Sequence, residues 1–143
     1  EIKAEIVGGD ERESGRRAVL NAGHTVAHAL EQVSAYAIPH GHAVGLGLVA
    51  ESELARRIGV AAPGVTHAVC SALEAAGLPV ALPSALDADA LLHAMTADKK
   101  NRDGVPRFAF VADVGRPHET AGGWTMTAPA AEIAAALAVI GAE

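Results

Sequence analysis

The chain has 143 residues, a length that suits one compact domain and leaves little room for a second. Its 11 Lys and Arg residues against 17 Asp and Glu residues give a formal net charge of −6. Because no basic stripe stands out and aromatic residues are scarce, we expect no nucleic-acid partner. No uncharged apolar run approaches the roughly 20 residues that span a bilayer, so we expect no membrane partner. The single cysteine, Cys70, cannot form an internal disulfide, which favours a reducing, cytoplasmic location.

The apolar content favours helices over strands. Half of the residues are hydrophobic but only 3% are aromatic, and much of the apolar content is alanine, the strongest helix former. A β-sandwich of this size would need more β-branched and aromatic side chains. The sequence therefore predicts a mainly α fold.

Residues 1–7 resemble the end of an element that begins upstream, and a chain that starts with Glu1 rather than Met is expected to lack an upstream portion. Apolar residues at three- and four-residue intervals predict one helix over 15–36. A second helix is expected over 40–58, after Pro39 and before Gly59. Two glycines inside it predict close packing against a neighbour; they are Gly45 and Gly47.

The second half of the chain predicts three more helices, over 63–76, 88–99 and 130–140. Asp87 is a suitable N-cap for the middle one. Between the last two helices the period changes, and residues 107–111 and 124–127 are expected to form a small hairpin. The predicted architecture is a helical, bundle-like domain with a small β-hairpin near its C-terminus.

Two pairs of histidines are the first candidates for chemistry. His24 and His28 are four residues apart and share one helix face, and His40 and His42 flank the start of the next helix. Imidazole is the commonest metal ligand, so these side chains could converge on one divalent ion. Histidines at this spacing also occur as surface or core hydrogen-bonding residues, and the spacing alone leaves both interpretations open. Three further histidines are expected to be structural or exposed: His67, His93 and His118.

The first predicted helix places Arg17, Asn21, His24 and His28 near one face. A cation, an amide and two imidazoles are costly to bury without partners. A bound anion together with a bound metal would satisfy them, whereas the alternative is a solvated helix face. The apolar sequence around them favours the bound ligands.

Four motifs, in their order along the chain, resemble those of the 3-dehydroquinate synthase family of sugar-phosphate cyclases. The resemblance covers nearly the whole chain. The longest motif runs from Arg17 through Leu20-Asn21, Gly23-His24-Thr25 and His28-Ala29 to Glu31. The others are Lys3-Ala4 with Val7, Asp10-Glu11 and Glu13, then Pro39-His40-Gly41 with Ala43-Val44, then Asp98-Lys99-Lys100. The resemblance implies the C-terminal half of a two-domain enzyme, with a nucleotide-binding N-terminal domain absent from residues 1–143.

The resemblance also implies roles for individual residues. His24 and His40 match two histidine ligands of a catalytic zinc (or another divalent ion such as cobalt), whose third ligand, a glutamate, lies upstream. Lys3 and His28 match catalytic positions. The remaining matches hold the substrate's carboxylate and phosphate, for which Arg and Lys are suited; they are Arg17, Asn21 and one of Lys99 and Lys100.

The implied activity is that of an NAD- and zinc-dependent carbon–oxygen lyase of the shikimate pathway, in aromatic amino acid biosynthesis. It converts 3-deoxy-arabino-heptulosonate 7-phosphate to 3-dehydroquinate and phosphate. NAD would be bound mainly by the absent domain, so we expect this fragment alone to be inactive. Its expected partners are the sugar phosphate and its own N-terminal domain, and the resemblance leaves a homodimer open.

Two residues depart from the family pattern, since His42 stands where a glutamate is usual and Ala27 where a glycine is usual. His42 is more typical of sister cyclases that make valiolone-type rings from sedoheptulose 7-phosphate. Two further alternatives remain: an iron-dependent alcohol or glycerol dehydrogenase, which has no need for Arg17 and Asn21, and a free-standing, non-catalytic metal-binding domain.

Overall fold

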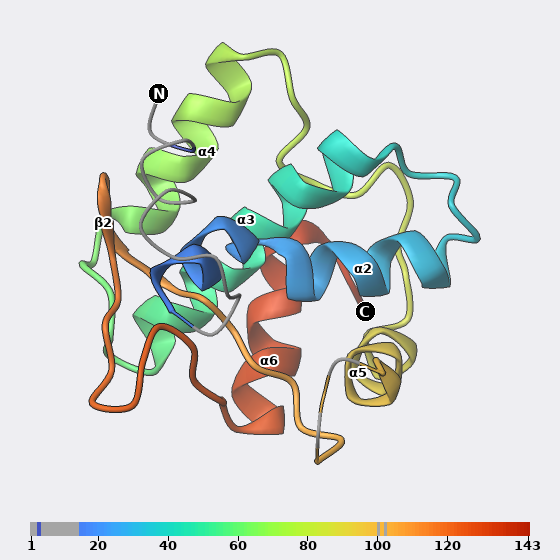
Figure 1. Cartoon of the computed structure of the whole chain (residues 1–143). Helices are drawn as coiled ribbons and strands as arrows, with labels where there is room; N and C mark the ends of the chain where they lie inside the picture. The colour runs from blue at the N-terminus through green and yellow to red at the C-terminus, as the bar shows by residue number, and fades with distance from the viewer. Residues whose placement is uncertain (1–2, 4–14, 100, 102) are drawn as a thin grey trace.

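The computed structural model describes residues 3, 15–99, 101 and 103–143 (Figure 1). The described chain is mainly helical, with one small antiparallel hairpin, as the sequence predicts. Its helices, including two 3₁₀ segments, are η1 (Arg16–Asn21), α2 (His24–Val33), α3 (His40–Arg57), α4 (Val65–Ala75), α5 (Ala88–Ala97), α6 (Ala130–Leu137) and η2 (Ala138–Ile140). The strands are β1 (Val111–Asp113) and β2 (Arg116–Pro117). The element expected over residues 1–7 lies, apart from Lys3, outside the described residues.

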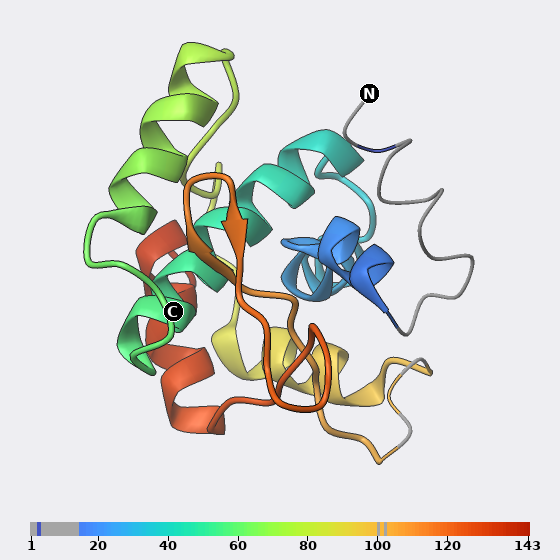
Figure 2. The ribbon, with the colours of Figure 1, turned by 60° about the vertical axis from the view of Figure 1, so that its left-hand side comes forward.

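Helix α3 is the centre of the domain and contacts α2, α4 and α6 (Figures 1 and 2). It begins directly after Pro39 and ends before Gly59, whose φ of +80° suits a glycine. Leu46 and Leu54, both at most 1% exposed, join the main apolar cluster from this helix. The predicted second helix is therefore confirmed to within one residue.

The prediction of one continuous helix over 15–36 is wrong, because the chain breaks at Gly23. This residue has φ +82° and separates the 3₁₀ segment η1 from α2. A Cβ atom added to Gly23 would lie 2.8 Å from Leu48 Cγ and 2.9 Å from the Val44 carbonyl oxygen of α3. The apolar period continues across the break, but the close approach of α3 fixes a backbone conformation that only glycine adopts readily.

The second half of the chain follows the prediction in its helices. Asp87 caps α5, as expected, by accepting a hydrogen bond from the Ala90 N–H at 2.8 Å. Helix α6 and η2 cover the predicted 130–140 and pack against α3. Cys70 is half-buried and packs against the main cluster, and burial raises the pKa of its thiol.

The hairpin is shifted from its expected position. β1 and β2 pair antiparallel, with Val111 opposite Pro117 and a turn at Gly115, whose φ is +74°. The expected pairing of 107–111 with 124–127 is reduced to a single bridge between Phe108 and Met126. Aromatic packing fixes the chain close to this bridge. The fully buried Phe108 ring stacks on the Phe110 ring, with centroids 5.4 Å apart.

None of the helices in the described part of the chain is long and apolar enough to cross a membrane.

Candidate functional site

A cavity of about 210 Å³ lies where α2 faces the end of α5 and the segment that follows it. It joins the first histidine motif to residues more than 70 positions later in the chain. Its lining residues are mostly polar: Ala18, Asn21, His24, Thr25, His28, Asp98, Asn101, Arg107, Ala109 and Thr125. Three predicted site residues, Asn21, His24 and His28, therefore lie together.

His24 is the first residue of α2, and a hydrogen bond to the preceding backbone orients its ring. Its Nδ1 lies 3.2 Å from the Ala22 carbonyl oxygen. Since a carbonyl oxygen only accepts, Nδ1 donates, and the neutral ring keeps an unprotonated Nε2. That nitrogen is the atom that would coordinate a metal.

His40, the first residue of α3, lies close to His24 although 16 positions separate them. The centroids of the two rings are 5.7 Å apart. The Nδ1–H of His40 donates to Glu31 Oε1 at 2.8 Å, which leaves its Nε2 unprotonated in the neutral ring. A histidine oriented by a carboxylate in this way is typical of metal ligands.

These two histidines fit a divalent metal only as part of a ligand set. Among residues 3, 15–99, 101 and 103–143, no group of three or more His, Cys, Asp and Glu side chains is arranged to hold an ion. Divalent zinc needs three or four ligands. Within the described residues the site thus offers two oriented imidazoles, fewer than the three or four ligands that a zinc ion needs.

His28 lies one turn after His24 and contacts its ring edge-on, with centroids 5.8 Å apart. Its Nδ1 lies 3.8 Å from Asp98 Oδ2, so a protonated His28 would form an ion pair with Asp98. The His28 side chain is 38% exposed and lines the cavity. His28 is therefore accessible to a bound substrate and has the Asp98 carboxyl group beside it.

None of the predicted cations that the structure describes lines the cavity of His24 and His28. Arg17 is half-buried and is not among the residues that line the cavity. Lys99 lines a neighbouring cavity that it shares with His28, and Lys3 is exposed. Lys100 lies outside the described residues.

Arg107 is a cavity residue that the motifs did not indicate. Its guanidinium donates to Thr125 Oγ1 and to the Thr125 carbonyl oxygen, both at 3.1 Å. Its own carbonyl oxygen accepts from Thr25 Oγ1 at 2.7 Å, which joins this segment to the first turn of α2. In sequence, Arg107 was only the first residue of an expected strand, and its distance from the histidines along the chain concealed its place in the cavity.

Glu51 is a second residue that sequence reasoning missed. Glu51 lies in α3 and is only 3% exposed, although its side chain carries a carboxyl group. Burial raises its pKa from 4.5 to about 7, and hydrogen bonds from the backbone N–H groups of Val26, Gly23 and Thr25 oppose that rise. The bonds to α2 place Glu51 directly behind the histidine site.

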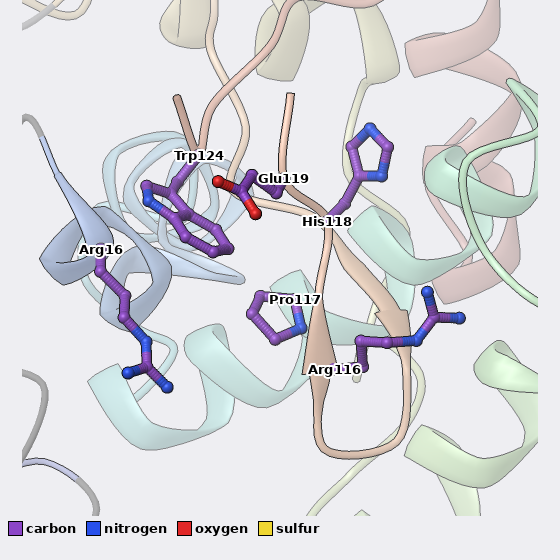
Figure 3. Close-up of a pocket in the computed structure, with 6 residues that line it drawn as sticks. All are labelled: Arg16, Arg116, Pro117, His118, Glu119 and Trp124. Carbon is purple, nitrogen blue, oxygen red and sulfur yellow. The ribbon is translucent and has the colours of Figure 1, made fainter. Parts of the chain in front are cut away.

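Two other cavities do not share this convergence. One, of about 420 Å³, is lined by Arg16, Arg116, Pro117, His118, Glu119 and Trp124 (Figure 3). In Figure 3 the Arg16 and Arg116 side chains lie on opposite sides of Pro117, and their guanidinium groups do not converge. His42 lines the other, mostly apolar cavity with Pro39 and Leu46, apart from the cavity that contains His24 and His28.

Comparison with known proteins places this arrangement among the sugar-phosphate cyclases. The family model described as "3-dehydroquinate synthase C-terminal" matches residues 1–101. The chain belongs to the 3-dehydroquinate synthase family, as the motifs indicated.

Relatives named 3-dehydroquinate synthase include one from Methylococcus capsulatus, 46% identical over 114 residues, and one from Nostoc punctiforme, 39% identical over 116. These alignments cover 79% and 80% of this chain but 32% of each relative. The chain thus spans about a third of the length of the curated relatives it matches.

The fold is also that of a solved sister enzyme. A crystal structure of 2-deoxy-scyllo-inosose synthase, complexed with carbaglucose-6-phosphate, NAD+ and Co2+, has a TM-score of 0.73 over 87% of this chain and 34% of its own. At 21% identity this likeness shows the fold alone.

Proposed function

We propose that residues 1–143 form the C-terminal, metal- and substrate-binding domain of a 3-dehydroquinate synthase. The substrate would be 3-deoxy-arabino-heptulosonate 7-phosphate and the products 3-dehydroquinate and phosphate. The observation that carries this proposal is the meeting of His24 and His40, each with Nδ1 bonded to an oxygen, so that both present Nε2. Relatives of that name support the choice of reaction.

The residues of this domain would bind and orient the substrate. His24 and His40 would hold a divalent ion, zinc or cobalt, which supplies Lewis-acid polarisation of a substrate hydroxyl. His28, with Asp98 at 3.8 Å, is suited to hold or release a proton at its ring nitrogen. Asn21 lines the same cavity and can hydrogen-bond the sugar hydroxyls.

The substrate's anionic groups require cations around this cavity. We assign Arg17 and one of Lys99 and Lys100 to the carboxylate and phosphate, and Lys3 to a catalytic position, as the motifs imply. NAD, which carries the hydride chemistry, and the further metal ligand are assigned to a nucleotide-binding domain that precedes this region. On this assignment, residues 1–143 alone are expected to release no phosphate from the substrate, because NAD and the further ligand would come from that domain.

A chimera tests this function. The region of the Methylococcus capsulatus enzyme that matches this chain is replaced by this chain, and phosphate release from the heptulosonate phosphate is measured with NAD and zinc. The chimera should turn over, and its His24→Ala variant should not. A folded chimera with no release above that control would contradict the proposal.

The valiolone-type alternative is favoured by one residue, His42, and the same chimera decides it. Both sugar phosphates are supplied in competition. Sedoheptulose 7-phosphate has no carboxylate, so an enzyme dedicated to it would have little use for the Arg17 guanidinium. Higher catalytic efficiency on sedoheptulose 7-phosphate would overturn the dehydroquinate assignment.

A further inference from the structure

Glu51 connects the core of α3 to the first turn of α2. Its Oε2 accepts a hydrogen bond from the Gly23 N–H at 2.7 Å, and its Oε1 accepts one from the Val26 N–H at 3.1 Å. Both donors belong to the start of α2, 28 and 25 positions earlier in the chain. A carboxyl group is costly to bury unless hydrogen bonds satisfy it, and these two bonds do so.

The start of α2 needs this carboxyl group because its own N-cap has no side chain. The N-cap is Gly23, which makes no side-chain cap bond. Its position excludes the usual capping residues, since any Cβ there would meet Leu48 and the Val44 carbonyl oxygen. The N–H groups at a helix start are otherwise unsatisfied and need an acceptor oxygen. Glu51 supplies from α3 the acceptor that Gly23 cannot.

The two hydrogen bonds to Glu51 come from backbone N–H groups on either side of His24 along the chain. One donor, the Gly23 N–H, precedes His24, and the other, the Val26 N–H, follows it. The ring of His24 is held in turn by the carbonyl oxygen of Ala22, whose peptide unit includes the Gly23 N–H. Any rotation of that peptide unit would therefore move both the carbonyl oxygen and the ring that it orients.

We propose that Glu51 is a positioning residue: by fixing the first turn of α2 from α3, it holds the His24 ring in its place beside His40. The inference rests on the proposed function for the purpose of that placement, a metal ion. The placement itself is a property of this chain and can be measured without any metal.

The variant Glu51→Gln keeps the shape of the side chain but replaces one acceptor oxygen with an NH₂ group, which would face a backbone donor. Two controls separate positioning from general stability. Ser52→Ala removes the neighbouring buried polar side chain of α3, and Leu54→Ala destabilises the core from the same helix. Neither control touches the bonds to Gly23 and Val26.

The readouts are the nuclear Overhauser contact between the His24 and His40 rings and amide hydrogen exchange along the chain. In Glu51→Gln the ring contact should be lost. We compare the exchange rate of the Gly23 and Val26 amides, divided by the rate of the α5 amides, in the two variants. This ratio should be about tenfold or more higher in Glu51→Gln than in Leu54→Ala, because Glu51→Gln removes a hydrogen bond to a buried acceptor. Retention of the ring contact, with exchange equal to that of Ser52→Ala, would overturn the proposal.

Glu51→Asp is the second variant, since it keeps a carboxyl group but shortens its reach by one methylene, and should change the same readouts. If neither variant folds, the proposal fails, because Glu51 would then be required for the fold itself and have no separable role. Cobalt titration of the chimera, in which the preceding domain is present, tests the link to function: Glu51→Gln should bind Co²⁺ about 10- to 100-fold more weakly than the parent chimera. A parent chimera that binds no Co²⁺ would count against the proposed function, while the ring contact would still decide the positioning role.

Discussion

Replacement of Gly47 with alanine should damage the domain at the contact between α2 and α3. A Cβ atom on Gly47 would overlap the carbonyl oxygen of Gly23 and lie 2.9 Å from its carbonyl carbon and 3.2 Å from the Ala27 nitrogen. That oxygen accepts the first hydrogen bond of α2, from the Ala27 N–H at 3.0 Å. The added methyl group thus competes with backbone atoms, which cannot move aside as the end of a flexible side chain can.

The expected cost follows from that difference. Overpacking a core against side chains costs about 1–3 kcal/mol, and a clash with backbone should reach the upper end, about 3 kcal/mol. Gly41→Ala is the matched control, because it lies in the same helix with nothing within 4 Å of its added Cβ. Its better helix propensity should stabilise the chain by up to about 1 kcal/mol. Gly45→Ala, which meets only the Leu73 side chain at 3.3 Å, should fall between the two.

Equilibrium urea unfolding, followed by circular dichroism, measures all three variants against the parent. The midpoints should rank Gly41→Ala highest, then Gly45→Ala, with Gly47→Ala far below. In Gly47→Ala the His24 ring should also lose its contact with His40, because the first turn of α2 is displaced. A Gly47→Ala variant within about 0.5 kcal/mol of Gly41→Ala would refute the reasoning, since substitutions without a clash stay within such limits.

Three further predictions concern Glu51, Asp87 and His42. Because burial raises the pKa of Glu51 from 4.5 to about 7, its contribution to stability should be full below pH 4.5 and be lost as the pH rises through 7. That difference corresponds to about 3 kcal/mol, so urea unfolding of the parent and of Glu51→Gln should give stability curves that diverge between pH 4.5 and 7; parallel curves would show that Glu51 does not titrate in this way. Asp87→Ala should cost about 1 kcal/mol through loss of the α5 cap, whereas Asp89→Ala, in the same first turn without the cap bond, should cost less by the same measurement. In the chimera, His42→Glu should leave the preference between the two sugar phosphates unchanged, because His42 lines a different cavity from His24 and His28; a reversed preference would show that His42 selects the substrate.

The sequence predicted those elements whose ends are marked by local chemistry. Helix α3 follows Pro39 and stops before Gly59, and α5 begins at Asp87, so proline, glycine and an acidic cap were sufficient. The break at Gly23 was not predictable from local pattern, because the apolar stripe continues through it. Its cause is the approach of Gly47 from a helix that begins 17 positions later.

The candidate site was predictable in its histidines and not in its surroundings. The four-residue spacing placed His24 and His28 on one face, as the structure shows. Glu51 was missed because a single acidic residue in a helix is usually solvent-exposed, and no local pattern marked it as buried. The burial of Glu51 is explained by its bonds to the start of α2, where Gly23 has no capping side chain. Arg107 likewise reaches the cavity through tertiary contacts.

The most direct test of the central claim, that His24 and His40 hold the catalytic metal, is the visible absorption spectrum of the cobalt-loaded chimera. Its ligand-field bands report the atoms bound to the ion. If these two histidines bind the ion, His24→Ala and His40→Ala should each change or abolish these bands, whereas His67→Ala, at an exposed position, should leave them as in the parent chimera. Bands that are identical in all four proteins would contradict the assignment of these two histidines to the metal.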